Sequence, residues 1–218
     1  MTATGTEAPG ERRPGRPRDV RADAAIMDAA VSVLADRGPA GFTVDEVAAR
    51  ARCGKATVYR RWPTRAALLL ETAQRLGLEP PRVDTGCLRG DMVVLMTALG
   101  RKMRATPAGR ILPAVIAEAS VDPGMRTVLT EFIKDRRVRP REVAERAVER
   151  GELPSDTDIE MFLDVLGGTV IYRELIAGIP TDVEVVTELV DRVLAAFGAT
   201  PAARAASVDP LAVEAASA

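Results

Sequence analysis

Apolar residues recur along most of the chain at spacings of three and four, the spacing that places side chains on one face of a helix. The first stripe begins after residue 21 and consists of Ile26, Ala29, Ala30, Val33 and Leu34. The segment 36–42, DRGPAGF, contains two glycines and a proline and predicts the end of this helix. Because no segment alternates apolar and polar residues as a strand does, the pattern predicts an all-α protein.

Two short helices with a tight break between them are predicted next. Thr43 and Glu46 form a capping-box pattern, in which a hydroxyl and a carboxylate bond the free backbone N–H groups of a first helical turn. This pattern predicts a helix over 44–51. The break at 52–54 separates it from a second short helix, predicted over 55–61.

Pro63 ends the second short helix, because the residue before a proline avoids helical backbone angles. Thr64 is expected to cap a helix over 65–76, and the Gly- and Pro-containing segment 77–86 is the clearest boundary in the chain. Beyond it the pattern predicts helices over 90–105, 107–120, 124–150, 156–178 and 182–197. The last two are expected to begin at capping pairs, which are Ser155 with Asp158 and Thr181 with Glu184.

These elements divide the chain into four parts. Residues 1–20 form a basic arm that is rich in Gly, Pro and Arg and too poor in apolar residues to fold alone. A small helical domain, 21–77, and a larger helical domain, 88–198, follow. The Ala-rich segment 199–218 is expected to be a flexible tail.

The composition excludes several kinds of chemistry. The 218-residue chain has no histidine, which removes histidine bases, Ser-His and Cys-His nucleophile pairs and histidine metal sites. Its two cysteines, Cys53 and Cys87, have no partner motif and are expected to be reduced thiols. No apolar run approaches the roughly 18 residues of a membrane span, and the polar start lacks a secretion signal. We therefore expect a cytoplasmic protein without enzymatic activity, cofactor, metal or membrane partner.

Charge is distributed unevenly along the chain. Residues 1–65 carry a net charge of +4 and residues 66–218 carry −5, although the whole chain carries −1. A basic end of this kind is typical of nucleic-acid binding. Two short helices joined by a tight turn match a helix-turn-helix, whose second helix enters the major groove of DNA. The hydroxyl, phenol and cationic side chains there suit phosphate and base contacts. The predicted contact residues are Thr43, Lys55, Thr57, Tyr59, Arg60 and Arg65.

The stretch TVDEVAARARCGKATVYRRWPTRAALL, residues 43–69, resembles the DNA-binding signature of TetR-type transcriptional regulators. The resemblance covers roughly residues 20–77 and implies that all six predicted contact residues are used on double-stranded DNA. It also implies a fold with an N-terminal three-helix helix-turn-helix domain, a larger C-terminal helical domain that binds a small-molecule effector, and a homodimer.

One position departs from the family pattern. The family usually has glycine in the turn between the two short helices, where this chain has Arg52. A left-handed backbone angle costs a non-glycine residue roughly 1 kcal/mol. Either the turn is rebuilt, or Arg52 bears this strain while it adds a phosphate contact.

Several neighbouring residues have alternative interpretations. Trp62 is expected to pack between the second short helix and the next one rather than to stack on a base. Tyr59 suits either packing or a phosphate contact. For Arg61 the alternative to a DNA contact is a side chain that only faces solvent. The expected core residues of the small domain are Val47, Ala48, Cys53 and Val58.

The basic arm contains the sequence RRPGRPRD at 12–19. Its Gly-Arg-Pro resembles the core of an AT-hook, an extended basic peptide that enters the narrow minor groove of A·T-rich DNA. Arg16 and Arg18 are therefore predicted DNA contacts, with an inert or non-specific tail as the alternative.

The last two long helices supply a candidate dimer interface. Gly167 and Gly168 lie in the middle of 156–178 and cost about 1 kcal/mol each relative to alanine, unless they permit close approach of another helix. The family resemblance implies a four-helix bundle across a two-fold axis, whereas the alternative is packing within one chain. The predicted interface residues are Phe162, Leu166, Gly167, Gly168, Val170, Val186, Leu189, Val190 and Val193.

Methionines on one face of 90–105 suggest a ligand pocket, because methionine adapts to irregular apolar shapes, although core packing explains the same stripe. Arg173 is expected either to pair with a neighbouring carboxylate or to bind an anionic ligand. The candidate pocket residues are Met92, Met96, Leu99, Met103, Phe132, Phe162, Tyr172 and Arg173.

The function these observations favour is a homodimeric repressor that a small molecule releases from a palindromic operator. The alternative is a DNA-binding regulator without a small-molecule inducer, controlled by a protein partner or by its own level. An all-helical enzyme is disfavoured, because histidine and a phosphate-binding glycine loop are both absent from the sequence.

Overall fold

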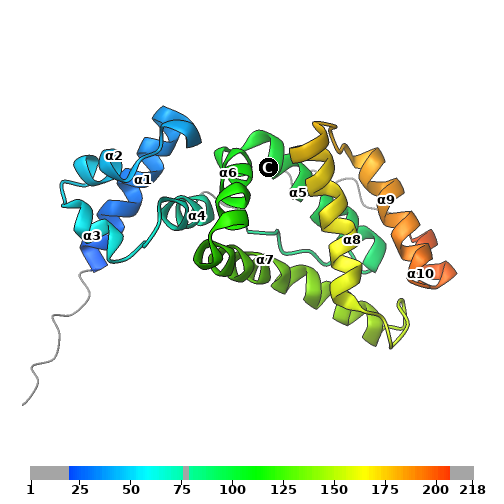
Figure 1. Cartoon of the computed structure of the whole chain (residues 1–218). Coiled ribbons are helices and arrows are strands. Elements are labelled where there is room, and N and C mark those ends of the chain that lie inside the picture. Colours follow the sequence, from blue (N-terminus) through cyan, green and yellow to red (C-terminus); the bar gives the residue numbers. More distant parts are fainter. Residues whose placement is uncertain (1–19, 76–78, 207–218) are drawn as a thin grey trace, which may run out of the picture.

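The computed structural model describes residues 20–75 and 79–206, and all regular elements in these ranges are helical (Figure 1). The prediction of an all-α fold is confirmed. The elements are α1 (Val20–Gly41), α2 (Val44–Arg50), α3 (Lys55–Tyr59), α4 (Arg65–Arg75), α5 (Leu88–Ala105), α6 (Pro107–Val121), α7 (Pro123–Glu149), α8 (Ile159–Ile171), the π-helical turn η1 (Tyr172–Ala177), α9 (Val183–Ala196) and α10 (Pro201–Ala205).

The helix starts follow the sequence signals in the first half of the chain. The hydroxyl of Thr43 accepts a hydrogen bond of 3.2 Å from the backbone N–H of Glu46, as the capping pattern predicts. Thr64 does the same for the N–H of Ala67, at 3.0 Å. Both caps lie where the predicted helices begin.

The two later capping predictions are wrong. Asp158, not Ser155, caps α8 and accepts from the N–H of Met161 at 3.0 Å. Asp182 caps α9 and accepts from the N–H of Val185 at 3.0 Å, whereas Thr181 is buried and donates its hydroxyl to Glu174. Aspartate caps a helix at least as well as serine or threonine, so the later residue of each segment starts the helix.

A first apolar core joins the N-terminal helices to part of the larger domain. The N-terminal helices α1 to α4 pack together, and α6 and the first half of α7 lie against them (Figure 1). The segment 77–86 therefore separates two stretches of sequence but not two cores. Members of this core beyond the boundary are Ile111, Val115, Ala119, Met125 and Phe132.

A second core is formed by α5, α8, α9 and the second half of α7. In its centre the ring of Phe162 meets that of Phe197 edge to face, with centroids 5.3 Å apart. The short helix α10 packs against α5 and α9 and buries Ala203, so residues 201–205 are not part of a flexible tail as the sequence suggested. The remainder of that predicted tail, 207–218, lies outside the described residues.

Helix α7 passes along both cores (Figure 1). It contains the buried Pro140 near the point where it leaves the first core for the second. A proline has no N–H to donate, so the carbonyl of Arg136 four residues earlier loses its usual helical partner. This interrupted turn lies beside the segment that follows Glu79.

Candidate nucleic-acid interface

The second short helix, α3, is held against the protein by one side only. A five-residue helix is not stable alone, so its packing must stabilise it. Val58 is completely buried, and the indole of Trp62 is buried beyond the end of α3. Burial of each of these side chains contributes about 1.5–3 kcal/mol. The indole N–H donates to the Glu71 carboxylate of α4 at 2.5 Å, so Trp62 joins α3 to α4 as predicted.

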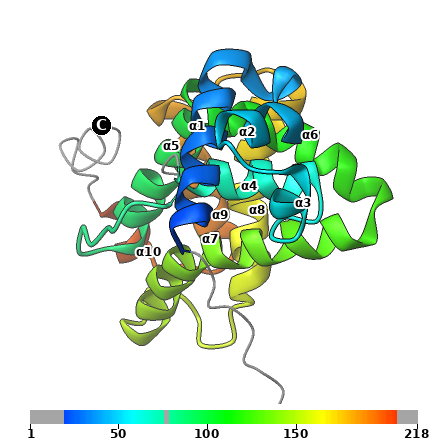
Figure 2. The same ribbon diagram turned by 90° about the vertical axis from the view of Figure 1, so that its left-hand side faces the viewer.

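The other side of α3 faces solvent, on the face of the molecule shown in Figure 2. Lys55 and Arg60 are exposed, Tyr59 is 46% exposed, and Thr57 is half-buried. Thr43 is also exposed at the start of α2. The structure thus places five of the predicted contact residues on or beside one outward helix face.

Lys55 forms an ion pair with Asp45 of α2. Both side chains are more than half exposed, and exposed pairs contribute about 0–1 kcal/mol. Exchange of this carboxylate for a phosphate oxygen therefore costs little.

Arg65 does not point toward the outer face of α3. Its Nε donates to the carbonyl of Phe42 at 2.7 Å, and its Nη2 donates to the carbonyl of Pro39 at 2.5 Å. These bonds give Arg65 a structural role that the sequence did not predict, because they tie α4 to the loop that precedes Thr43. It positions the start of α2.

Arg61 is not simply solvated. Its side chain is 17% exposed, forms an ion pair with Asp23 of α1 and donates to the carbonyl of Thr57 at 3.3 Å. Arg61 therefore joins α3 to α1, and Arg60 beside it is the arginine that faces outward.

A further arginine on α2, Arg50, was missed in the sequence. It donates to Asp36 at 2.5 Å and to Ser32 at 2.8 Å, both on α1, and to Glu46 at 3.3 Å. The hydrogen bond to the Asp36 carboxylate is the main reason that the pKa of Arg50 is raised. Only the bond between Glu46 and Arg50 could be predicted locally, because the two residues are four positions apart on one helix.

The turn between α2 and α3 keeps the left-handed geometry that the family pattern implies. Arg52 has φ +54° and is the non-glycine residue with positive φ in the described ranges. The turn is not rebuilt, and Arg52 carries the backbone strain with its side chain exposed. Arg16 and Arg18, predicted contacts of the basic arm, lie outside the described residues.

Most of the predicted dimer residues are core residues of a single chain, because they face α5 and the neighbouring helices. Leu189 is half-buried, whereas Gly168 is exposed. A Cβ added at Gly167 or Gly168 would meet no atom within 4 Å, so these glycines are not required by packing within the described chain. The residues corrected from interface to core are Phe162, Leu166, Val170, Val186, Val190 and Val193.

The predicted ligand pocket is not assembled either. Met92, Met96 and Phe162 pack in the second core, and Phe132 belongs to the first. Met103 is buried and Leu99 half-buried. Core packing, the alternative interpretation of the methionine stripe, therefore describes these side chains.

The last two predicted pocket residues lie in η1. Tyr172 is exposed, and Arg173 is half-buried and donates to the carbonyl of Pro180 at 3.5 Å. Neither side chain lines the two hollows beside α7 that are described below.

Within residues 20–75 and 79–206, no helix has the length and apolar character needed to cross a membrane. The same residues contain no group of three His, Cys, Asp or Glu side chains arranged to hold a metal ion. Cys53 and Cys87 are both free and half-buried.

Two family models match almost the whole described chain. The model described as bacterial regulatory proteins, tetR family, matches residues 26–72. The model described as tetracyclin repressor-like, C-terminal domain, matches residues 80–193. The first match contains α2 and α3 with their outward face, and the second contains the exposed face of α8 and the lining of both hollows except Glu79.

Individual relatives agree over most of their length. The uncharacterized HTH-type transcriptional regulator YdeS of Bacillus subtilis is 32% identical over 190 residues, which cover 86% of this chain and 96% of that protein. The DNA-binding transcriptional repressor TetR of Mycobacteroides abscessus is 33% identical over 174 residues, covering 78% of this chain and 90% of the relative. The crystal structure of the TetR family transcription regulator SCO0332 is 31% identical, with a TM-score of 0.68 over 83% of this chain and 100% of that one.

Proposed function

Because this chain belongs to the TetR family and is therefore a DNA-binding transcriptional regulator, we propose that it acts as a homodimeric repressor released from its operator by a small molecule. The observation that carries the DNA-binding part is the outward face of α3. Its cations and phenol are exposed, while Val58 and Trp62 hold the opposite side in the core.

In the proposed complex, α3 lies in the major groove and the exposed Lys55, Tyr59 and Arg60 contact phosphates or base edges. Thr43 offers the start of α2 to a phosphate. Arg61 and Arg65 support this surface from behind and are assigned no DNA contact. A single face of this size reads a short half-site, so a second copy is needed for useful specificity.

The proposed dimer surface is the exposed stripe of α8 and η1. Met161, Val165, Gly168 and Tyr172 follow one another at intervals of four, three and four and are all exposed. Two observations support pairing through this stripe: regulators of the TetR family form dimers, and the space around Gly168 is open. The repressor role is supported by the Mycobacteroides relative, which is named a transcriptional repressor.

The DNA-binding proposal is tested by footprinting the purified protein on the promoter region of its own gene. We expect protection of a roughly palindromic site. The double substitution Lys55→Ala with Tyr59→Phe should weaken binding at least tenfold, because it removes one charge and one hydroxyl from the contact face. Lys134→Ala, which removes an exposed charge from α7, is the matched control and should bind like wild type.

Two outcomes would count against this proposal. One is a wild-type protein that protects no site in that region. The other is a double variant that binds DNA normally although it remains folded by circular dichroism.

A further inference from the structure

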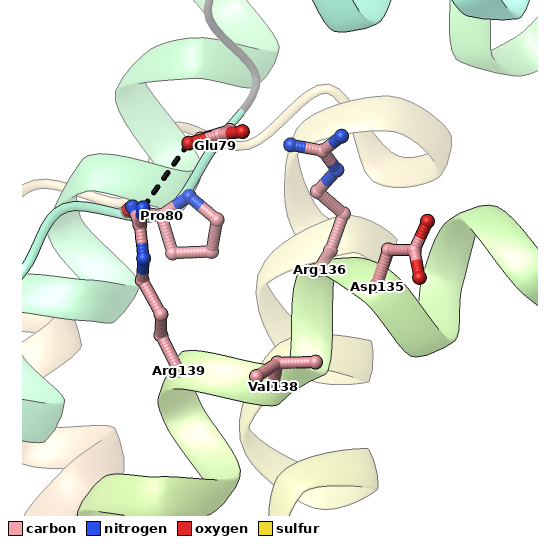
Figure 3. A pocket seen from close by; sticks show the side chains of 6 residues that line it. All are labelled: Glu79, Pro80, Asp135, Arg136, Val138 and Arg139. Carbon is pink, nitrogen blue, oxygen red and sulfur yellow. Dashed lines mark hydrogen bonds and ion pairs between the residues drawn. The ribbon is translucent and has the colours of Figure 1, made fainter.

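A hollow of about 320 Å³ lies between α7 and the segment that leads from α4 to α5 (Figure 3). A second hollow of about 310 Å³ adjoins it and shares Val138 and Arg139. Each volume is at the lower end of the range found for small-molecule sites. The first hollow is lined by Glu79, Pro80, Asp135, Arg136, Val138 and Arg139.

Three cations converge on Glu79 at the edge of the first hollow. Arg139 donates to the Glu79 carboxylate at 3.1 Å and also to the carbonyl of Pro80. Lys102 of α5 donates to the backbone carbonyl of Glu79. Arg136 faces the same carboxylate across the hollow in Figure 3. Asp135 lines the same hollow and also acts on the charge of Arg136, so two carboxylates stand among three cations.

Arg136 is the cation with the least satisfied side chain. Its Nε is buried and has no hydrogen-bond partner among the described residues. Its guanidinium carbon lies 5.0 Å from the centroid of the Phe132 ring, which supports one face of the group. A buried donor without a partner costs free energy that an incoming acceptor would recover.

The charges around the two hollows also favour the binding of an anion. Burial, followed by the charges of Arg136 and Arg139, lowers the pKa of Lys102. Burial likewise lowers the pKa of Arg136. The second hollow is lined by one carboxylate, Glu142, and by three arginines, Arg82, Arg139 and Arg146.

We infer that this pair of hollows binds a small organic carboxylate, whose carboxylate group pairs with Arg136 and Arg139 while its apolar part lies against Pro80 and Val138. The planar guanidinium presents donors in a fork that matches the two oxygens of a carboxylate. The apolar lining favours an organic anion over an inorganic one. A neutral ligand would offer no negative charge to Arg136, whose Nε lacks an acceptor among the described residues.

The regulatory consequence rests on the proposed function, whereas the binding itself does not. The incoming carboxylate competes with Glu79 for Arg139 and so loosens the contact of the segment after α4 with α7. Glu79 is four positions beyond Arg75, the last residue of α4, and α4 carries the partner of Trp62. Binding would thereby change the position of α3 relative to the rest of the protein.

The binding site is tested by isothermal titration calorimetry of the full chain with benzoate, salicylate and octanoate, each added to about 10 mM, where a 1 mM site is largely filled. Benzyl alcohol tests whether the negative charge is needed, and inorganic phosphate tests whether an anion without an apolar part is sufficient. We expect saturable binding of at least one carboxylate and none of benzyl alcohol.

Two variants of opposite expected effect separate binding from folding. Arg136→Gln should weaken the carboxylate at least tenfold, whereas Glu79→Gln should tighten it about threefold, because it removes the competing carboxylate. Arg126→Gln, on an exposed position of the same helix, is the control and should leave affinity unchanged. A misfolded variant cannot produce the gain expected for Glu79→Gln.

The inference is overturned if no carboxylate gives saturable heat, if phosphate or benzyl alcohol binds as well as the carboxylates, or if Arg136→Gln binds like wild type. Fluorescence anisotropy with operator DNA is measured separately. A protein that binds the carboxylate but no DNA contradicts the proposed function and leaves this site intact. A protein that binds DNA but no carboxylate contradicts only this site.

Discussion

At the residue scale, Arg52 combines an unfavourable backbone with an exposed cation. A residue with a Cβ at φ +54° is strained by roughly 1–2 kcal/mol relative to glycine in the same place. The residue lies in the turn between α2 and α3, and its side chain is exposed. The strain is consistent with a functional contribution of the arginine that glycine would not make.

We predict that Arg52→Gly raises the free energy of unfolding by about 0.5–1 kcal/mol, because relief of strain exceeds the extra entropy that glycine gives the unfolded chain. The same substitution should weaken operator binding, since a cation is lost. Urea unfolding and fluorescence anisotropy measure the two effects.

Arg52→Lys is the control for both effects, because it keeps the charge and the Cβ. It should leave both stability and operator affinity close to wild type. Loss of stability in Arg52→Gly would show that the arginine side chain, rather than its backbone, dominates this turn.

Lys102 gives a prediction for pH. Its pKa in the folded protein is lowered from 10.5, chiefly by burial, so the unfolded chain holds the proton more tightly. Protonated Lys102 therefore destabilises the fold at neutral pH, and this penalty falls as pH rises through the lowered pKa toward 10.5. Wild type should gain stability relative to Lys102→Met across that alkaline window, measured by urea unfolding at several pH values. A constant difference between the two proteins would contradict the assignment.

The sequence predicted those residues whose partners are close in the chain. The cap at Thr43 and the wedge at Trp62 depend on neighbours three and nine positions away. The two carbonyl partners of Arg65 and the carboxylate partner of Arg61 lie 23 or more positions away, on α1 or in the loop after it. Which arginine faces outward is decided by such distant partners, so Arg65 was assigned to the DNA face from type and spacing alone.

At the scale of elements, the helix-turn-helix depends on fixed contacts with the helices around it. The loop before α2 is held by Arg65 of α4, α2 is joined to α1 by Arg50, and α3 is joined to α1 by Arg61. These contacts come from behind the proposed DNA face. The exposed residues of α3 are thereby left to bind the operator.

We predict that Arg65→Met destabilises the protein by about 2 kcal/mol, because the carbonyls of Phe42 and Pro39 lose a charged donor. Arg65→Lys should recover part of this loss. Arg60→Met, on the exposed face, should change stability by less than about 0.5 kcal/mol and weaken operator binding instead. Normal stability with lost DNA binding in Arg65→Met would restore the original assignment of this residue to a phosphate.

Helix existence was predictable from α1 to α9 but not at α10, and some helix starts were not predictable either. Apolar periodicity identifies a helix through many residues, whereas its first residue depends on one hydrogen bond. At α8 and α9 two polar candidates compete for that bond, and the aspartate takes it in each case. At α9 the competing hydroxyl of Thr181 already has a buried acceptor, Glu174, which no local pattern reveals.

At the scale of the whole molecule, the two cores do not coincide with the two sequence domains. Residues 79–86 are not helical, as the Gly- and Pro-containing segment 77–86 predicted. This break does not show that α6 returns to pack on α1 and α4. Apolar periodicity identifies which face of α6 is buried but not which helices cover it.

The same ambiguity explains why most predicted dimer residues are buried within a single chain. Helix α8 is apolar around most of its circumference, and the sequence does not distinguish the side facing α5 from the side facing a second chain. The structure assigns Leu166 and Val170 to the inner side and leaves Val165 and Gly168 outside.

We predict that Val165→Lys converts the proposed dimer to a monomer, because two lysines would meet in the proposed apolar interface. Val128→Lys is the matched control, since Val128 is 38% exposed on α7 and Val165 is 37% exposed. Light scattering after size-exclusion chromatography gives the mass. A Val165→Lys protein that keeps the dimer mass would place the interface elsewhere.

The shared first core has a practical consequence for any attempt to isolate the DNA-reading part of the protein. A shortened gene that stops after residue 75 would produce four helices stripped of the aliphatic cover that Ile111 and Val115 provide. The freed surface would favour aggregation over function. Helices α1 to α4 therefore cannot be treated as a separate module, and chimaeric proteins that contain them should also contain α6 and the beginning of α7.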